Sequence, residues 1–502
     1  MSGDHVEVRR GAYHDSVTLM QVSRQVADVD GVEAAQVAMG TELNLDFMRG
    51  VGFDPPADAG PNDLVVAVRA GGDDAVAAAL ARLEEVLTTT GGGSGDGLGG
   101  RDPEPRTIGS AVRRAVEPPS LALVSVPGPH AFTEAWSALQ AGLSVLVFSD
   151  NVPVEQEVAL KDEAARRGLL VMGPDCGTAV VGGIGLGFAN QVRPGPVGVV
   201  AASGTGAQQV MCMLDTRQVG VSHCLGVGGR DLSATVAGRS TKAALALLDE
   251  DPATELVVLV SKPPDPAVAA DVTAYAESLS TPVLVALLGP GQDDLTTVAR
   301  KAVEHLGAEW ADPWSWDEQP APVAGGSLRG LFAGGTLCDE AMLIASETLG
   351  EVRSNIPLRP EWALGEDLRS PGHLMVDFGD DALTQGRAHP MIDQRTRIDR
   401  LAAEGADPSC SVLLLDVVLG HAANPDPAAE LAPAIAAARG RAAEDGRELA
   451  VVVSLCATHD DPQQPRRQAD LLHDAGASVW LSNAAAARHA VALVTGSTGA
   501  TR

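Results

Sequence analysis

Short apolar runs alternate with amphipathic stretches through the middle of the chain, and this alternation predicts strands followed by helices. Amphipathic helices are expected at segments such as Ala131–Ala141 and Val154–Arg167. The apolar runs are Leu121–Val126, Leu143–Phe148, Leu169–Met172, Val197–Ala202, Val221–Gly226, Leu256–Val260 and Val283–Leu288. Such strand–helix–strand repeats predict parallel sheets with right-handed connections, so the expected fold class is α/β.

Both ends of the chain continue this pattern. Residues 1–88 predict a small N-terminal α/β domain, and residues 329–502 predict a last α/β region. In the first, the strands are Val6–Arg9, Ala34–Met39 and Leu64–Arg69, and the helices Asp15–Ala27 and Asp73–Leu87 begin with good N-cap residues. In the second, the apolar runs are Leu331–Ala333, Leu374–Phe378, Val412–Leu419, Ala450–Leu455 and Val479–Leu481.

Two segments of different composition separate these regions. Residues 88–100 read TTTGGGSGDGLGG, which predicts a flexible linker within residues 89–117. A second break, rich in Pro, Gly and Trp, covers residues 308–328. Several domains are expected from the length of 502 residues.

Composition excludes some classes of function. The net charge of −30 argues against nucleic acid and anionic membranes as partners. The N-terminus has no signal-peptide core, and no apolar run of 18 residues is free of Gly and charge, so we expect a cytoplasmic protein. Six cysteines without CxxC spacing, at positions 176, 212, 224, 338, 410 and 456, indicate neither a metal site nor a disulfide framework.

The turn Ser203-Gly204-Thr205-Gly206 is the most informative motif. It follows an apolar strand and opens the segment Ala207–Met211. A strand, a glycine turn and a helix start expose backbone N–H groups and two hydroxyls at the positive end of a helix. This arrangement predicts a site for phosphate or a carboxylate.

Other glycine-rich loops follow successive strands, where ligands gather in open α/β sheets. They begin at Gly173, Gly226, Ser261, Gly334, Asp377, Gly386 and Gly420. A single loop of this kind is more often structural than functional. The recurrence of such loops after successive strands is what favours a binding site.

Three features in these loops have both a chemical and a structural interpretation, and a fourth points to anion binding. Asp380 and Asp381 fit either a Mg²⁺ or substrate site or a solvated helix N-cap. His421 fits a catalytic base or nucleophile, or a polar loop residue. Cys176 is either reactive or packed in a turn. Arg387 and His389 together form an anion-binding pair.

At GPDCGT (173–178) and SGTG (203–206) the chain resembles a known family. Residues 119–300 resemble the α subunit of succinyl-CoA synthetase, an ADP/GDP-dependent acyl-CoA ligase, and HCLGVGGRDL (223–232) resembles its VGIGGD loop. Residues 329–497 resemble, more weakly, the C-terminal domain of the β subunit. With SKPP (261–264) and GRAHPMID (386–393), nearly the whole chain is similar to the FdrA family.

This resemblance implies three ligase-type domains after the first linker. Residues 118–192 correspond to a Rossmann-like domain of the CoA-binding type, and residues 193–307 to a flavodoxin-type ligase domain. Residues 329–502 correspond to a second ligase-type domain.

The departures from the ligase are informative. The ligase carries a phosphohistidine in a GHAGA loop, where this chain has Gly289-Pro290-Gly291-Gln292-Asp293-Asp294. The glutamate that supports the phosphohistidine is replaced by the segment Ser261–Pro264. The CoA phosphate loop and the ATP-grasp domain are missing as well. His421 lies in a similar GHAA string but in another domain, so the phosphohistidine role is not transferred to it.

The FdrA resemblance implies a subunit of an oxamate carbamoyltransferase of allantoin and purine catabolism, working with two other proteins. The reaction converts oxalurate and phosphate to oxamate and carbamoyl phosphate, so phosphate is a co-substrate and neither CoA nor nucleotide is expected. Two opposed helix starts, at Ser203–Thr205 and Gly420–His421, would face the phosphate. Whether the chain also forms a homo-oligomer stays open.

The expected site residues follow from the loops. Ser203, Gly204, Thr205 and Gly206 hold phosphate, and Lys262, Arg230 and Arg387 neutralise anionic charge. His389 binds or protonates the substrate. The remaining expected binding residues are Asp175, Cys176, Asn190, Gly228, Gly229, Gly420 and His421.

Two rival functions remain. An acyl-CoA ligase predicts CoA binding and acid-labile phosphorylation by ATP. A non-catalytic scaffold or regulatory subunit predicts that loop substitutions leave the rate unchanged.

Overall fold

The computed structural model describes residues 3–12, 14, 16–56, 58–90, 105–316, 323, 325–385 and 387–496. These residues divide into two compact units. The first comprises Met1–Pro118, Ser125–Ala131 and Thr384–Ala388, and the second comprises Pro119–Val124, Phe132–Leu383 and His389–Arg502. Residues 91–104 of the expected Gly-rich linker lie outside the described residues, and within its described part helix α4 (Ile108–Arg114) forms.

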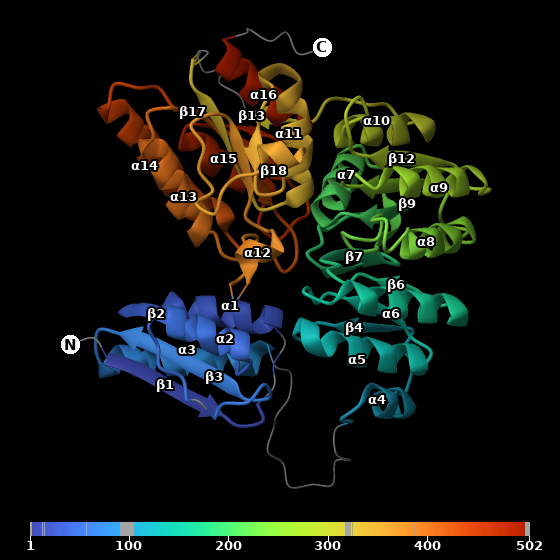
Figure 1. Cartoon of the computed structure of the whole chain (residues 1–502), viewed down its shortest axis with the longest axis horizontal. Helices are drawn as coiled ribbons and strands as arrows, with labels where there is room; N and C mark the ends of the chain where they lie inside the picture. Colours follow the sequence, from blue (N-terminus) through green and yellow to red (C-terminus); the bar gives the residue numbers. More distant parts are fainter. Residues whose placement is uncertain are drawn as a thin grey trace. The chain divides into compact units, whose positions relative to one another are not determined.

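The first unit contains an antiparallel sheet of three strands in the order β1-β3-β2. The elements are β1 (Gly3–Arg9), α1 (Ser16–Ala27), β2 (Val32–Met39), α2 (Glu42–Gly50), β3 (Leu64–Ala70) and α3 (Asp73–Thr90). One face of the sheet packs on α1 and α3 through residues such as Val22, Val66 and Leu83, and the other packs on Leu45 and Met48 of α2 (Figure 1). The expected strands and helices form, and α2 is an addition.

The second unit begins with a parallel three-stranded sheet in the order β4-β5-β6. Its elements are β4 (Leu121–Val124), α5 (Gly128–Gln140, of which residues up to Ala131 belong to the first unit), β5 (Ser144–Val147), α6 (Val154–Arg167) and β6 (Val171–Met172). The next strands, β7 (Thr178–Val181) and β8 (Ile184–Gly187), form a hairpin that joins the following sheet. Sequence periodicity did not predict this hairpin, whose two strands are joined by the glycine turn Gly182-Gly183.

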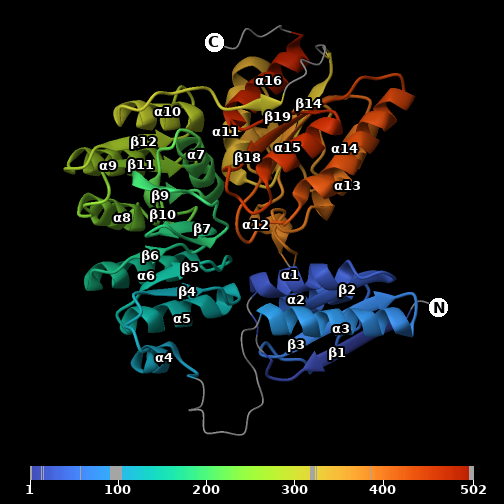
Figure 2. The ribbon, with the colours of Figure 1, turned by 180° about the vertical axis from the view of Figure 1, so that it is seen from behind.

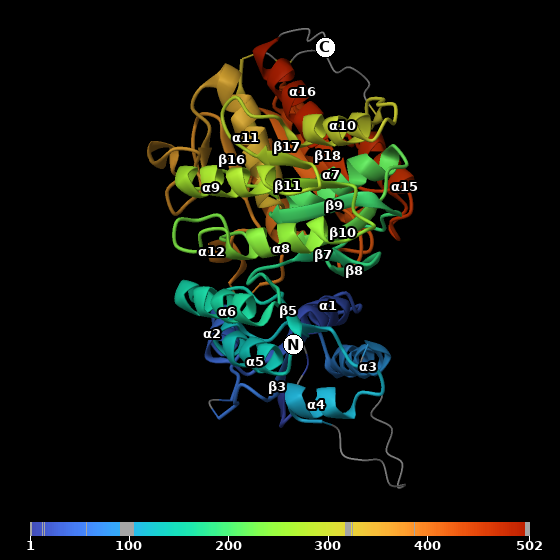
Figure 3. The same ribbon diagram turned by 90° about the vertical axis from the view of Figure 1, so that its right-hand side faces the viewer.

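The second sheet of this unit has the order β12-β11-β9-β10-β7-β8, and its first four strands are parallel. It is called the second sheet below, and the seven-stranded sheet that follows it is called the third. Helices α7 and α10 pack together, as do α8 and α9, and Figure 3 shows α8 and α9 in front of the strands. The strands are β9 (Pro194–Ala202), β10 (Val221–Gly226), β11 (Leu256–Ser261) and β12 (Val283–Leu287). The helices are α7 (Gly204–Thr216), α8 (Arg239–Asp249), α9 (Pro266–Glu277) and α10 (Leu295–His305).

The third sheet has seven strands in the order β13-β19-β18-β17-β14-β16-β15, and all but β13 are parallel. Helices α11 and α16 pack together on one face, and α13, α14 and α15 form a row that Figure 2 shows from behind. The strands are β13 (Ser315–Trp316), β14 (Ser327–Phe332), β15 (Arg353–Ser354), β16 (Leu374–Asp377), β17 (Cys410–Val418), β18 (Ala450–Cys456) and β19 (Ala477–Trp480). The helices are α11 (Gly335–Leu349), α12 (Asp381–Thr384), α13 (Arg395–Ala406), α14 (Pro427–Glu444), α15 (Pro465–Asp474) and α16 (Asn483–Thr495), with a 3-10 turn at Pro360–Trp362.

Parallel register brings together the loops in which the sequence predicts the site. Ala202 at the end of β9 pairs with Ser261 at the end of β11, so the Ser203 turn and Lys262 leave the sheet side by side. In the third sheet Phe332 of β14 pairs with Asp377 of β16. Helix α7 of the second sheet contacts α11 of the third, which joins the two sets of loops. In the part of the chain that the structure describes, no helix is long and apolar enough to cross a membrane.

Candidate functional site

The Ser203 turn is a capped helix start. Ser203 has extended backbone (φ −166°), and its hydroxyl accepts a hydrogen bond from the Gly206 N–H at 3.0 Å. This bond satisfies one of the free donors of the first turn of α7. Ser203 and Thr205 are buried, whereas Gly204 between them is exposed. The strand, turn and helix expected from the sequence are therefore present.

The helix start that faces α7 is that of α11. The Ser203 hydroxyl donates to Thr336 Oγ1 at 2.6 Å, and a side chain at Gly334 would come within 2.9 Å of three Thr205 atoms. Gly334 caps α11 without a side chain; instead, the buried Asp416 carboxylate accepts from the N–H groups of Ala333 (2.7 Å) and Gly334 (2.8 Å). Two helix N-termini thus meet at one place, where their dipoles together favour an anion.

The expectation that Gly420 and His421 form the second helix start is wrong. Helix α14 begins at Pro427, because a proline at the first helical position fixes the start there. His421 forms a β-bridge with Ala189, and its exposed ring lies 3.0 Å from Gln191 Oε1. Gly420 has a positive φ of 116° and packs closely on the Ala189 carbonyl. Both residues belong to the contact between the second and third sheets.

Lys262 is a cation beside the start of α11. A side chain at Gly335 would lie 3.0 Å from the Lys262 ammonium and 2.6 Å from Asp377 Oδ2. Burial alone lowers the pKa of Lys262, but the charges of Asp339, Asp377, Asp175 and Asp380 outweigh it and raise the pKa above its usual value. Within the described residues its ammonium makes no direct ion pair or hydrogen bond. The charge is retained and remains available to an anionic ligand.

Three carboxyl groups around Lys262 bind protons unusually tightly. Burial raises the pKa of Asp339 and of Asp377 to about 7, although Lys262 opposes the shift in both. Burial, assisted by the negative charge of Asp381, also raises the pKa of Asp175 to about 7. Asp175 is the exposed member of the three, whereas Asp339 and Asp377 are buried. Near neutral pH these groups can both give and take protons.

His389 faces the same cluster as a neutral ring. Burial, with the Arg397 charge, lowers the pKa of His389 to about 4. Its Nδ1 accepts from the Met391 N–H at 3.2 Å, which leaves the other ring nitrogen protonated. That nitrogen, Nε2, lies where a side chain at Gly379 would come within 2.7 Å of it. The ring is therefore neutral near pH 7 and can donate from Nε2, and the expectation that His389 binds or protonates the substrate stays a prediction.

Arg387 stays an untested candidate. It is exposed and belongs to Thr384–Ala388 of the first unit, whereas His389 belongs to the second unit. The proposed pairing of Arg387 with His389 remains a prediction. Their neighbour Gly386, the first residue of the GRAHPMID segment, lies outside the described residues.

Arg230 has structural partners. It donates to the Val152 carbonyl at 2.8 Å and pairs with the fully buried Glu157 at 2.9 Å. Gly228, two residues before Arg230, has φ +90° and lies so close to Pro174 that a Cβ would come within 2.4 Å of its carbonyl oxygen. Gly229 lies beside the Asp175 carboxylate. The loop after β10 is therefore built to support the loop that carries Asp175.

Two further residues expected to bind the ligand, Asn190 and Cys176, are buried and have structural roles instead. Asn190 is buried, and it donates to the Leu419 carbonyl (3.0 Å) and to Asp461 (2.8 Å) while accepting from Gln208. Cys176 is buried, and burial raises the pKa of its thiol to about 12. Asn190 has no free group for a ligand, and the Cys176 thiol is unreactive at neutral pH, so the assignment of both to binding is wrong.

The Asp380–Asp381 pair matches the N-cap interpretation in part. Asp380 accepts from the Ala382 N–H at 3.0 Å at the start of α12. Burial and the charges of Asp150 and Asp380 raise the pKa of Asp381. Among the residues that the structure describes, no group of three or more His, Cys, Asp or Glu side chains is arranged to hold a metal ion.

Sequence reasoning missed Asp339, Asp377 and Asp416. Asp377 is the last residue of an apolar strand, and its neighbours Asp380 and Asp381 drew attention instead. Asp339 lies one turn into α11 after GGT, and Asp416 lies inside the apolar run of β17. A charged residue inside a buried strand is the signal that could have identified Asp416, since such residues are rarely buried without a partner.

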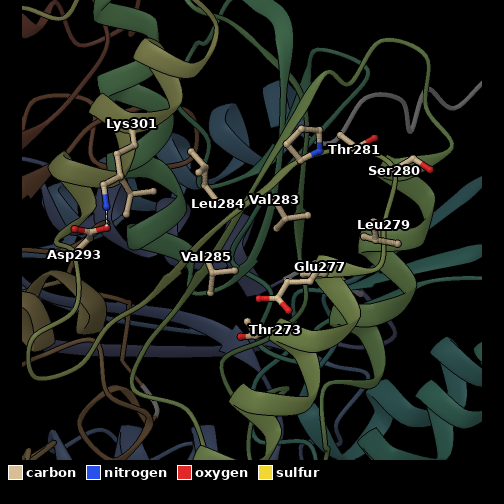
Figure 4. Close-up of a pocket in the computed structure, with 13 residues that line it drawn as sticks. Thr273, Glu277, Leu279, Ser280, Thr281, Val283, Leu284, Val285, Asp293 and Lys301 are labelled. Carbon is tan, nitrogen blue, oxygen red and sulfur yellow. Dashed lines mark hydrogen bonds and ion pairs between the residues drawn. The ribbon is translucent and has the colours of Figure 1, made fainter.

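A separate pocket of about 580 Å³ lies along the edge strand β12. Figure 4 shows Val283, Leu284 and Val285 of this strand in its wall, with the Lys301–Asp293 ion pair to one side. None of the site residues expected from the sequence lines it. The pocket is therefore distinct from the cluster around Lys262.

Known families match both ends of the chain. Residues 1–103 match the AllF, heavy metal-associated domain, and residues 331–493 match the CoA-ligase family. The donor set of residues 1–103 is a poor fit to a soft metal ion: it has no cysteine, Met39 and Met48 are buried in the core, and it has only two histidines, of which His5 lies 3.3 Å from Glu7. The match therefore supports a fold for this region and no metal chemistry.

Individual proteins are also similar to parts or to nearly all of the chain. The α subunit of the ADP-forming succinate–CoA ligase of Methanothermobacter thermautotrophicus is 28% identical over 193 residues, 37% of this chain and 61% of that protein. An acetyl-coenzyme A synthetase of Ca. Korarchaeum cryptofilum, solved with phosphate and ADP, aligns over 81% of this chain and 90% of its own, at 16% identity and a TM-score of 0.30. YahF of Escherichia coli (strain K12) is 39% identical over 498 residues, 94% of this chain and 95% of YahF. The chain belongs to the family of YahF, an α/β family with a CoA-ligase-type domain and an AllF-type N-terminal domain.

Proposed function

We propose that the chain is the phosphate-binding subunit of a carbamoyl-transferring enzyme that converts oxalurate and phosphate to oxamate and carbamoyl phosphate. The observation that carries the proposal is the meeting of the α7 and α11 starts beside Lys262, joined by the 2.6 Å Ser203–Thr336 hydrogen bond. Phosphate would bind at these N-termini, with its charge offset by the helix dipoles and Lys262. The AllF-type domain supports a place in allantoin catabolism.

The surroundings of the helix starts also suit this reaction. The chain has no histidine in the segment Gly289–Asp294, where the ligase-type phosphohistidine would stand. Transfer of a carbamoyl group to free phosphate needs no phosphoenzyme, CoA or ATP. It needs the phosphate oxygen to be held against the carbamoyl carbon, and positioned cations and N–H groups to stabilise the developing negative charge.

The test is phosphate-dependent cleavage of oxalurate by the full chain with its two expected partner subunits. We expect Lys262→Ala to lower kcat by about 10²–10³-fold, the size of the loss of one preorganised charge-stabilising group. Ser203→Ala should raise the KM for phosphate, since its hydroxyl fixes both helix starts. Unchanged rates in both variants would show the assignment to be wrong.

The CoA-ligase match at residues 331–493 favours a second candidate, an ADP-forming acyl-CoA ligase. It requires CoA binding and an acid-labile phosphoenzyme. Incubation of the complex with γ-labelled ATP, followed by acid quenching, separates the two functions. Stable binding of CoA together with acid-labile label would favour the ligase over carbamoyl transfer.

A further inference from the structure

We propose that Asp377 is the acid–base residue of this site, which carries a proton between the phosphate nucleophile and the leaving nitrogen. The inference rests on the proposed function and adds a catalytic residue to it. Asp377 ends β16 and is buried. Its backbone is clamped by Asn355, whose side-chain amide accepts from the Asp377 N–H and donates to its carbonyl, both at 2.9 Å. These two hydrogen bonds fix the backbone position from which the Asp377 side chain extends.

The two oxygens of Asp377 have different surroundings. Oδ1 accepts from the Gly379 N–H at 2.9 Å and is held in place. Oδ2 faces the first residue of α11, where a side chain at Gly335 would lie 2.6 Å from it and 3.0 Å from the Lys262 ammonium. Gly335 is only partly buried, so the absence of a side chain leaves space beside Oδ2 at the helix start. One oxygen is anchored and the other is directed at the phosphate-binding place.

The proposed reaction requires a proton carrier at this position. A phosphate oxygen forms a bond to the carbamoyl carbon, and the bond from that carbon to the oxamate nitrogen breaks with its electron pair on nitrogen. An amide nitrogen leaves poorly as an anion, so it must be protonated as it departs. The carboxylic acid form of Asp377 gives its proton to this nitrogen, and the resulting carboxylate takes the proton of hydrogen phosphate. Protons and charge balance without any further reactant.

Asp377 suits this role better than the other carboxyl groups of the cluster. Asp339 lies a full turn further along α11, away from the free N–H groups of the helix start. Asp175 lies in a loop with positive φ (58°), where its carboxyl faces Gly229. Burial raises the pKa of Asp377 to about 7, so near neutral pH both of its protonation states are populated.

The test compares wild type and Asp377→Asn in the complete complex, with Asp399→Asn on the exposed side of α13 as control. Asparagine keeps the size of the side chain and the acceptor for Gly379 but carries no transferable proton. We expect kcat for oxalurate to fall by about 10²–10⁴-fold with little change in the KM for phosphate. The wild-type kcat should decline as pH rises through about 7, and the variant should lack this decline.

The outcomes separate this role from the proposed function. A wild-type complex that does not cleave oxalurate with phosphate overturns both. An active wild type whose kcat shows no decline between about pH 6 and 8 overturns the role of Asp377, whether or not the variant folds. An active wild type with an equally active Asp377→Asn variant also overturns the role alone.

Discussion

The two helix starts that meet at the site are built in different ways. Helix α7 is capped locally by Ser203, whose hydroxyl accepts a hydrogen bond from the N–H group of Gly206, three residues further along the chain. Helix α11 has a glycine at its N-cap. The N–H groups just before the helix, those of Ala333 and Gly334, donate to the carboxylate of Asp416 in a neighbouring strand. Asp416 in turn pairs with Arg397 at 2.9 Å, and both side chains are fully buried. One start is therefore specified by its own motif and the other by tertiary structure.

This difference explains why the sequence identified one start and misplaced the other. SGTG carries its cap within four residues, so a local reading suffices. GGT carries no polar cap, and the residue that replaces the cap lies 82 positions away. The GHAA string has the more suggestive composition, but its glycine and histidine pack against Ala189 instead of opening a helix.

The comparison predicts its largest effect at Asp416. Asp416→Ala leaves the Arg397 charge buried without its partner and frees the N–H groups of Ala333 and Gly334. Breaking a buried ion pair costs about 3–5 kcal/mol, and we expect this loss in urea-induced unfolding of the full chain. Asp46→Ala in the exposed Asp46–Arg49 pair of α2 is the matched control, with an expected loss below about 1 kcal/mol. Equal losses in both variants would contradict the idea that α11 depends on tertiary support.

Asp339, in the first turns of α11, is expected to make the stability of the protein depend on pH. Its pKa is raised by burial from 3.8 to about 7, so the folded state binds this proton more tightly than the unfolded state does. The stabilisation is complete below the unfolded pKa and is lost as pH rises towards 7. Between about pH 5 and 8 the free energy of unfolding should fall by roughly 3 kcal/mol less in Asp339→Asn than in wild type.

The direction of this effect is specific to a buried acid. His389 has the opposite sign, because burial lowers its pKa to about 4 and its contribution to stability therefore grows as pH rises from there to its unfolded value. Urea titrations of wild type, Asp339→Asn and the exposed control Asp399→Asn at several pH values measure the difference. A variant with the wild-type pH dependence would show that Asp339 is ionised in the folded state.

Local sequence patterns predicted most of the fold, and far less of the site. The helix Val154–Arg167 and the strand Val221–Gly226 have the expected bounds, because periodicity and apolar runs report burial directly. Ser203 and Lys262 were found because each follows a strand, and parallel register brings strand ends together. The Asp416–Arg397 pair depends on the arrangement of the seven-stranded sheet, and the Asp377–Lys262 neighbourhood depends on how this sheet meets the six-stranded one through α7 and α11. Neither arrangement is written in any local sequence pattern.

The smallest loss of unfolding free energy is expected for a substitution at the start of α7. It is also the most direct test of whether the α7 and α11 starts depend on each other. A Cβ at Gly206 would lie 2.4 Å from Ser203 Oγ and 2.9 Å from Thr336 Cγ2, so Gly206→Ala wedges the two helix starts apart. The matched control is Gly204→Ala two residues earlier, where the nearest atom, Thr178 Oγ1, is 3.3 Å away. Overpacking costs about 1–3 kcal/mol, and we expect that loss only for Gly206→Ala.

Phosphate binding by isothermal titration calorimetry adds a readout that stability alone does not supply. If the anion is held between α7 and α11, Gly206→Ala weakens binding more than its effect on folding explains, and Gly204→Ala does so less. If the anion is held by α7 alone, Gly204→Ala is the more damaging change, because Gly204 is the exposed residue of that turn. The ranking of two alanine substitutions, two residues apart, therefore decides whether one helix start or two form the site.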